Sequence, residues 1–215
     1  MEEYRRSVSH LAVEINLPQL PELIQRFLYD QLYPDGHFSL SDMSLHACPN
    51  FSGQISVFHS ASVTYHVQDD IGIHCEHIRS TPSWYKGPPR YDCAYVNARP
   101  HLEGMHSLDV VRIFLFFSFA FEGTTYPCAL VHWFRLIGDE PDEDTGMWIV
   151  EPESSDDSPT ISVIHLDCIL RAAHLIPIYG PNPIPRNIFY YNSLDAFRAF
   201  HVDKFIDYHA FNIAK

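Results

Sequence analysis

One stretch of the chain, residues 108–136, constrains the fold more than any other. It holds two apolar runs on either side of Glu122-Gly123-Thr124, which has the composition of a turn. Apolar residues in the first run alternate at a period of two, which predicts a strand that is buried on at least part of both faces. A glycine between two such runs predicts a β-hairpin, and we place this hairpin at the centre of a β core. One face of the first strand would carry Val111, Ile113, Leu115, Phe117, Phe119 and Phe121, and the other Phe114 and Phe116.

Composition agrees with a folded domain that has a large core. The chain has 215 residues, of which 46% are hydrophobic and 19% are charged. Such a chain buries enough apolar surface to fold, and we expect a single domain over residues 1–215. The net charge of −13 argues against a protein whose main partner is a phosphate backbone, because that task requires many lysines and arginines. The sequence therefore shows no strong nucleic-acid signature.

The cysteines and the N-terminus bear on the location of the protein. There are five cysteines, and none of them are paired at C-x-x-C spacing. An odd number without that spacing favours reduced thiols in an intracellular protein, nuclear or cytoplasmic. The first ten residues contain no apolar signal core. The longest apolar run is far shorter than the roughly 20 residues that span a bilayer, so we expect no membrane partner.

Helices are predicted at both ends of the chain and strands between them. Residues 8–33 read as a helical segment with Pro21 in a first turn. Alternation over residues 54–67 predicts one long strand, residues 69–90 read as irregular, and the β core extends over 54–180. Ser193 can cap a last helix over 193–211. The fold class that follows is α+β and β-dominated, a curved antiparallel sheet or barrel with an N-terminal and a C-terminal helix.

An acidic loop follows the predicted hairpin. Asp139, Asp142 and Asp144 lie close together there, and clustered carboxylates are the ligands that Mg²⁺ and Ca²⁺ prefer. Such a site would make the protein a metal-dependent nuclease or hydrolase. The spacing does not match an EF-hand, and a solvated loop is the favoured interpretation because charge runs are weak signals of sites. A second set of metal-ligand types is His74-Cys75-Glu76-His77, in which the two histidines would share a face if the segment were helical. No known zinc-site spacing is matched, and a solvated loop is again the favoured interpretation.

Aromatic residues give a further hypothesis. Trp133, Trp148 and nearby tyrosines are of the type that builds a cage for a methylated lysine, and His132 lies beside Trp133. An acidic loop next to such a cage would favour a basic peptide such as a histone tail. Plain packing is the more common role of aromatics in a β core.

Several long phrases of the sequence resemble the C-terminal region of fungal Plavaka-type transposon proteins, which are related to the KDZ transposases. The phrases are LPELIQRFLYDQLYPD (20–35), HS (59–60), IRSTPSWYKGPPRYD (78–92), YPCALVHWF (126–134), GDEPDEDTGMW (138–148), SVIHLDCILRAAHLIPIYG (162–180) and SLDAFRAFHVDKFIDYHAF (193–211). The resemblance covers nearly the whole chain, although DDIGIHCEH (69–77) departs from the glycine-rich version of the family. In such proteins the transposase chemistry is attributed to an upstream RNase H-like core. The resemblance therefore implies a segment without that core and transfers no catalytic residue.

We therefore expect a non-catalytic accessory or interaction domain derived from a transposon-encoded protein, with no cofactor. A protein partner is expected, either chromatin or a transposase-related protein. The alternatives are the metal-dependent nuclease that uses the acidic loop 139–144 and a histone-tail reader. The second alternative draws on a likeness of the hairpin and ALVHWF pattern to the bromo-adjacent homology β-barrel, an analogy at the level of fold.

Overall fold

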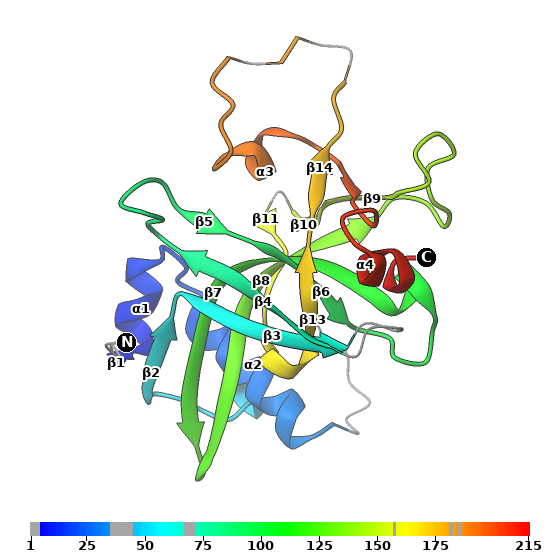
Figure 1. Cartoon of the computed structure of the whole chain (residues 1–215). Helices are drawn as coiled ribbons and strands as arrows, with labels where there is room; N and C mark the ends of the chain where they lie inside the picture. Colours follow the sequence, from blue (N-terminus) through cyan, green and yellow to red (C-terminus); the bar gives the residue numbers. More distant parts are fainter. Residues whose placement is uncertain (1–4, 35–44, 67–71, 157, 181–182, 185) are drawn as a thin grey trace.

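A computed structural model describes residues 5–34, 45–66, 72–156, 158–180, 183–184 and 186–215. The fold is β-dominated α+β, with an antiparallel sheet that curls into a half-barrel and with helices near both ends of the chain (Figure 1). The expected fold class is confirmed. No helix in the described ranges is long and apolar enough to cross a membrane. The helices are α1 (Val8–Glu14), α2 (Leu20–Leu32), α3 (Ser193–Ala196) and α4 (Tyr208–Ile213).

The main sheet contains ten strands, and its central path runs β1-β2-β7-β8-β9-β15-β14. Strand β12 pairs with β8, and β13 pairs with β6, which in turn pairs with β7. These strands are β1 (Arg5–Ser7), β2 (Gln54–Phe58), β6 (Cys93–Asn97), β7 (Leu108–Phe121), β8 (Thr124–Leu136), β9 (Trp148–Pro152), β12 (Ile161–His165), β13 (Ile169–Ala173), β14 (Leu175–Pro177) and β15 (Phe200–Val202). A second sheet holds β3 (Ser60–His66), β4 (Ile73–Thr81) and β5 (Arg90–Tyr91), and β10 (Ser154–Ser155) pairs with β11 (Ser158–Pro159).

The β7–β8 hairpin is the centre of the main sheet, as predicted. Its turn is Glu122-Gly123, because Phe121 pairs directly with Thr124. Both turn residues have positive φ, +50° for Glu122 and +83° for Gly123. Two successive residues with a left-handed backbone conformation give a two-residue turn the twist that matches the flanking strands.

A β-bulge interrupts the predicted alternation along β7. The pairing with β8 shifts between Ile113 and Leu115, which makes Phe114 an extra residue in the ladder. On one side of the bulge, Val111 and Ile113 pack toward the β3–β4 side of the sheet. Beyond it, Leu115 and Phe117 pack toward α1 and α2. The expectation that Val111 to Phe121 share one face is therefore wrong, because the bulge exchanges the two faces.

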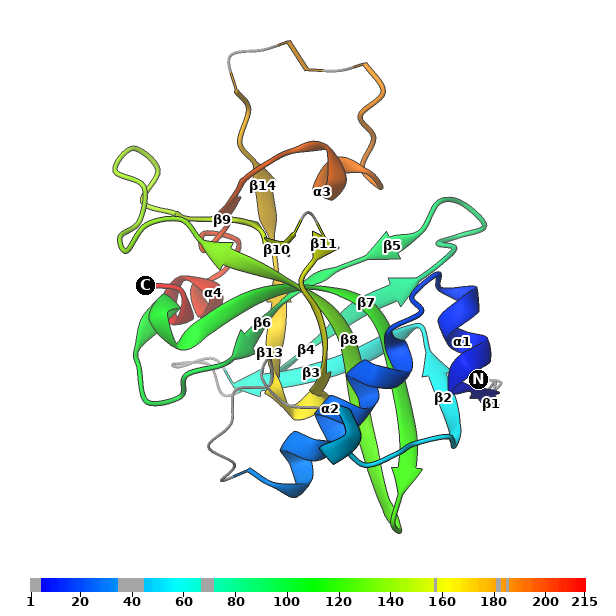
Figure 2. The ribbon, with the colours of Figure 1, turned by 180° about the vertical axis from the view of Figure 1, so that it is seen from behind.

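Three clusters of buried side chains make up the core. The first lies between α1, α2 and the distal half of the hairpin, where Ile24 and Leu28 meet Phe117, which is 1% exposed. Figure 2 shows α2 lying across this face of the β7–β8 hairpin. The second cluster lies under the C-terminal segment, and the third lies between the hairpin and the β3–β4 side. Helix α2 begins with Pro21 in its first turn, as predicted for the segment 8–33.

Two predictions for the β core are wrong. The chain from 54 to 66 forms two strands and not one, because β2 pairs with β7 whereas β3 pairs with β4. The segment read as irregular contains the nine-residue strand β4. His74 and His77 therefore lie on a strand and not in a loop, and a separation of three along a strand places the two side chains on opposite faces.

The C-terminal segment also differs from the prediction of one helix over 193–211. It consists of two short helices, α3 and α4, separated by strand β15. Phe200 and Val202 of that strand pair with Val150 and Trp148 of β9 and are buried. Pairing with the sheet edge at this point overrides the helical spacing of the apolar residues.

Candidate functional site

A cavity of about 890 Å³ lies between helix α1 and the strands β2, β7, β8 and β12. Its volume falls within the range of ~300–1,000 Å³ that is common for sites that hold small molecules. Aliphatic side chains from each of these elements line it, namely Leu11, Val57, Leu115, Leu130 and Ile161. In both overall views, α1 lies beside β2 with the β4–β5 strands beyond it (Figures 1 and 2).

The bulge in β7 helps to shape this cavity. Successive residues of a regular strand point to opposite faces, yet Phe114 and Leu115 both line the cavity. The register shift at Phe114 removes the alternation at this point. Bulges commonly redirect a side chain beside a functional site, and this one adds an aromatic ring to the cavity wall.

The two rings of the aromatic wall, Tyr91 and Phe114, contact each other and the guanidinium of Arg112. Tyr91 and Phe114 meet edge to face, with ring centroids 5.7 Å apart. The guanidinium of Arg112 lies 5.7 Å from the centroid of Tyr91 and 5.4 Å from that of Phe114, within range of a cation–π interaction. Arg112 is itself buried and paired with Asp195, at 2.5 Å between Nη1 and Oδ1. Burial raises the pKa of Tyr91, which therefore stays neutral, and the nearby Arg112 opposes the shift.

The polar residues of the lining are Arg6, Glu14, Asn16, His59, Ser80 and Tyr91. Arg6 and Glu14 form an ion pair with each other, and both are partly exposed. His59 is exposed and lies between β2 and β3. Ser80 is 1% exposed, and its hydroxyl has no hydrogen-bond partner among the residues that the structure describes. The lining thus combines an apolar body with an internally neutralised pair of charges.

The three aromatic candidates from the sequence do not form one cage. Trp133 packs against the third core cluster and donates its indole N–H to Ser162 Oγ at 2.6 Å. Trp148 is 3% exposed and belongs to the second cluster, beneath the C-terminal segment. His132 Nε2 lies 2.9 Å from the carbonyl oxygen of Glu153, and its ring stacks on Phe114 at 6.1 Å. Of the three, His132 is therefore the one that contacts the cavity wall, from behind Phe114.

The acidic loop is an ordered turn. Asp142 Oδ1 accepts hydrogen bonds from the backbone N–H and the hydroxyl of Thr145, at 2.9 and 2.7 Å. These bonds lower the pKa of Asp142. Asp139 and Asp144 are exposed on either side. In the described part of the chain, no three His, Cys, Asp or Glu side chains gather in a way that would hold a metal ion.

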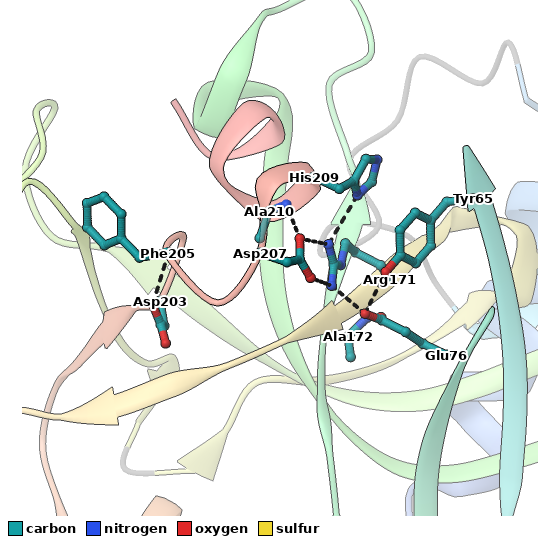
Figure 3. A network of polar contacts seen from close by, with 9 residues as sticks. All are labelled: Tyr65, Glu76, Arg171, Ala172, Asp203, Phe205, Asp207, His209 and Ala210. Carbon is teal, nitrogen blue, oxygen red and sulfur yellow. Dashed lines mark hydrogen bonds and ion pairs between the residues drawn. The ribbon is translucent and has the colours of Figure 1, made fainter. Parts of the chain in front are cut away.

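The most elaborate polar cluster was not predicted as a site. Arg171 on β13 is fully buried and pairs with Asp207 through two hydrogen bonds, of 2.8 and 2.6 Å. Its second partner is Glu76 on β4, which also accepts from Tyr65 and from the Ala172 N–H (Figure 3). The guanidinium lies 4.7 Å from the centroid of the Tyr65 ring.

This cluster fastens the C-terminal segment to both sheets. Asp207 also caps α4 by accepting from the Ala210 N–H at 2.8 Å, and His209 stacks on Tyr65 at 4.4 Å. The hydrogen bonds from Arg171 lower the pKa of Asp207 to about 2. Burial, with the charge of Arg171, lowers the pKa of His209. Desolvation and the bond to Glu76 raise the pKa of Tyr65 to about 12. Both terminal nitrogens of the Arg171 guanidinium are bonded to the carboxylates, whereas its buried Nε has no partner among the described residues. The cluster therefore serves as a structural clamp.

A signal for the clamp was present in the sequence, whereas none was present for the cavity. Arg171 stands alone in the apolar run ILRAA, and a lone charge in a buried strand predicts a buried partner. Its partners Glu76 and Asp207 are 95 and 36 residues away, so spacing does not identify them. The cavity depends on the bulge and on the approach of α1, neither of which the apolar pattern encodes.

No family model matches the chain, and comparisons with the curated proteins and with the solved structures found no match. What the protein does therefore has to be inferred from its own residues and geometry.

Proposed function

We propose that this chain is a non-catalytic binding domain whose ligand occupies the cavity between α1 and the sheet. The observation that carries the proposal is the combination of a volume of about 890 Å³ with a wall of Phe114, Leu115 and Ile161. A large, well-formed and mostly apolar cavity is the default position of a binding site in a small domain. The candidate acidic residues 139, 142 and 144 do not line it.

A proposal about the origin and setting of the domain is supported by the sequence alone. We propose that it derives from a transposon-encoded protein and acts as an accessory domain beside a chromatin or transposase-related partner, as the phrases shared with the Plavaka-type proteins imply. Cys48, Cys75, Cys93, Cys128 and Cys168 are all free thiols, which supports a reducing compartment such as the nucleus or cytoplasm.

The test is a titration with N-phenyl-1-naphthylamine, an uncharged dye whose fluorescence rises in apolar surroundings. The wild-type protein should bind the dye, and two variants that fill the cavity from different strands, Ile161→Trp and Val57→Trp, should weaken binding by at least about tenfold, or roughly 1.4 kcal/mol. Ile149→Trp on β9 is the matched control, because Ile149 has similar partial burial but does not line the cavity.

Circular dichroism and thermal unfolding establish that each variant is folded. Absence of dye binding to the wild-type protein, or equal binding by Ile161→Trp, Val57→Trp and Ile149→Trp, would overturn the proposed function.

A further inference from the structure

The cavity is polar where it opens to solvent and apolar within. Four polar lining residues are exposed or partly exposed and therefore border the opening, and we call them the mouth: Arg6, Glu14, Asn16 and His59. The leucines of the lining are all buried, namely Leu11, Leu17, Leu115 and Leu130. The other two polar residues lie deeper. Tyr91 is half-buried in the aromatic wall, and the hydroxyl of Ser80 is buried out of reach of a ligand.

The C-terminal end of α1 contributes to both the mouth and the interior. The helix ends in a Schellman motif, in which Asn16 has φ +54° and donates its N–H to Val13 O at 3.2 Å. The Leu17 N–H bonds to Ala12 O at 2.8 Å. This turn leaves Asn16 exposed and buries Leu17. Exposed polar and more buried apolar residues thus alternate over positions 14–17, all four of which line the cavity.

The turn between β2 and β3 repeats this arrangement. Phe58 is half-buried and lines the cavity, whereas the next residue, His59, is exposed at the mouth. The backbone of His59 is fixed, because its carbonyl oxygen accepts the Ser80 N–H at 2.9 Å. Neither the His59 nor the Asn16 side chain makes a hydrogen bond within the described ranges. An amide and an imidazole can each donate or accept, so both are available to a polar group of a ligand.

The charges at the mouth favour neither sign of ligand charge. Arg6 and Glu14 pair with each other, so a carboxylate that approaches Arg6 also meets Glu14, and an ammonium group at Glu14 also meets Arg6. The net charge of −13 further disfavours an anion. An uncharged group with hydroxyls avoids these repulsions and can bond to the amide and the imidazole.

We propose, on the basis of the function proposed above, that the ligand is an uncharged amphiphile with an apolar chain and a hydroxyl-bearing head group. The chain lies in the interior against Leu115, Leu130 and Ile161, and the head group lies at the mouth, where it bonds to Asn16 and His59. Burial of the chain is favourable in proportion to the apolar area removed from water. The head group stays partly hydrated, so no polar group has to be buried without a partner.

Alkyl β-glucosides, used below their critical micelle concentrations, test this orientation by displacing the bound dye. Hexyl, heptyl and octyl glucoside differ only in the chain, and each added methylene should strengthen binding about fourfold. Octyl maltoside adds a second sugar, which remains in solvent, so its affinity should lie within about threefold of that of octyl glucoside. Affinity that is independent of chain length, or a larger loss with the maltoside, overturns the orientation.

The head-group charge is tested with nonanoate and octylammonium at pH 7. They carry the same eight-carbon chain on an anionic and a cationic head group. Both should bind at least about threefold more weakly than octyl glucoside at low ionic strength, because each meets a like charge at the mouth. If either one binds as tightly as octyl glucoside, the ligand is not of the uncharged class.

The double variant Asn16→Gly/His59→Ala tests the residues assigned to the head group. Glycine keeps the left-handed backbone at position 16. The variant should bind octyl glucoside at least about fivefold more weakly, while its affinity for the dye, which has no such head group, changes by less than about twofold. His46→Ala is the control, since His46 is exposed and does not line the cavity. Unchanged glucoside binding, or an equal loss for glucoside and dye, overturns the assignment.

The outcomes separate the two proposals. If the dye does not bind, or if Ile161→Trp and Val57→Trp do not weaken its binding, the proposed function itself fails. If the dye binds in the cavity and the glucosides do not displace it, the binding function stands and the ligand class is wrong.

Discussion

At the scale of single residues, the buried charge of Arg171 and its ion pairs link stability to pH. The Arg171 guanidinium is fully buried, and its two carboxylate partners, Glu76 on β4 and Asp207 before α4, are far apart in the sequence. Buried ion pairs are costly to disrupt, because removing one partner leaves the other uncompensated. The pKa shifts in this cluster therefore make the free energy of unfolding depend on pH.

Acidification should destabilise the protein in two stages. The folded-state pKa of His209 is lowered from 6.5, so the folded state resists protonation, and stability should fall as the pH drops below about 6.5. The pKa of Asp207 is lowered from 3.8 to about 2, so the stability gained from its charge is present above 3.8 and is lost between 3.8 and about 2.

The first stage is tested with His209→Gln, which keeps an acceptor for Arg171 without a titrating ring. Urea unfolding measured across this pH range should show a weaker pH dependence for the variant below 6.5. Identical pH profiles for the variant and the wild-type protein would contradict the assignment to His209.

Phe117 tests the position of the core. It is 1% exposed within the cluster that joins α2 to the hairpin. Phe117→Ala should lower the free energy of unfolding by about 3–5 kcal/mol, as measured by urea denaturation. The exposed Phe189, substituted in the same way, should change it by no more than about 0.5 kcal/mol. A near-neutral effect of Phe117→Ala would show that the hairpin is not the core.

At the scale of elements, one of the two residues in the β7–β8 turn is poorly suited to its backbone conformation. Glu122 adopts φ +50°, which is unfavourable for a residue with a Cβ, whereas Gly123 at +83° is well suited. Gly123→Ala should cost about 1–2 kcal/mol of stability, because nothing crowds the new methyl and only backbone strain is added. Glu122→Gly should instead raise the melting temperature. A fall in melting temperature for Glu122→Gly would contradict the left-handed turn.

Local patterns predicted the elements whose neighbours in space are also neighbours in sequence. The hairpin was predictable because its two apolar runs and its glycine lie together. Strand β4 was missed because its first half is exposed, so that Ile73 and His74 show no alternation between buried and exposed positions. Strand β15 was missed because its partners β9 and β14 lie about 50 and about 25 residues earlier, and pairing with distant strands leaves no trace in local spacing.

The β-bulge in β7 was not predictable for a different reason. It moves Phe114 to the cavity wall, and with it the aromatic feature on which the candidate site depends. All five residues of IFLFF (113–117) are apolar, so the sequence fits either assignment of the two faces. The position of the extra residue is fixed by the pairing with Val131 and Leu130 on β8. The apolar composition of the site was thus predictable, but its location was not.

At the scale of the whole molecule, two sets of contacts hold other segments against the curled sheet, and a cavity remains between α1 and the sheet. The Arg171 clamp holds the C-terminal segment against β4 and β13, and α1 with α2 covers the distal half of the hairpin (Figures 1 and 3). The cavity lies between α1 and the sheet. The clamp therefore stabilises the fold, and the cavity is the proposed binding site.

Methyl NMR of the protein saturated with N-phenyl-1-naphthylamine shows directly whether the cavity is the binding site. We expect intermolecular nuclear Overhauser effects from the dye to the methyl groups of Leu115, Leu130 and Ile161, which line the cavity. Contacts to Val150 and Val202 in the C-terminal cluster instead, or no contact to any methyl group, would contradict it.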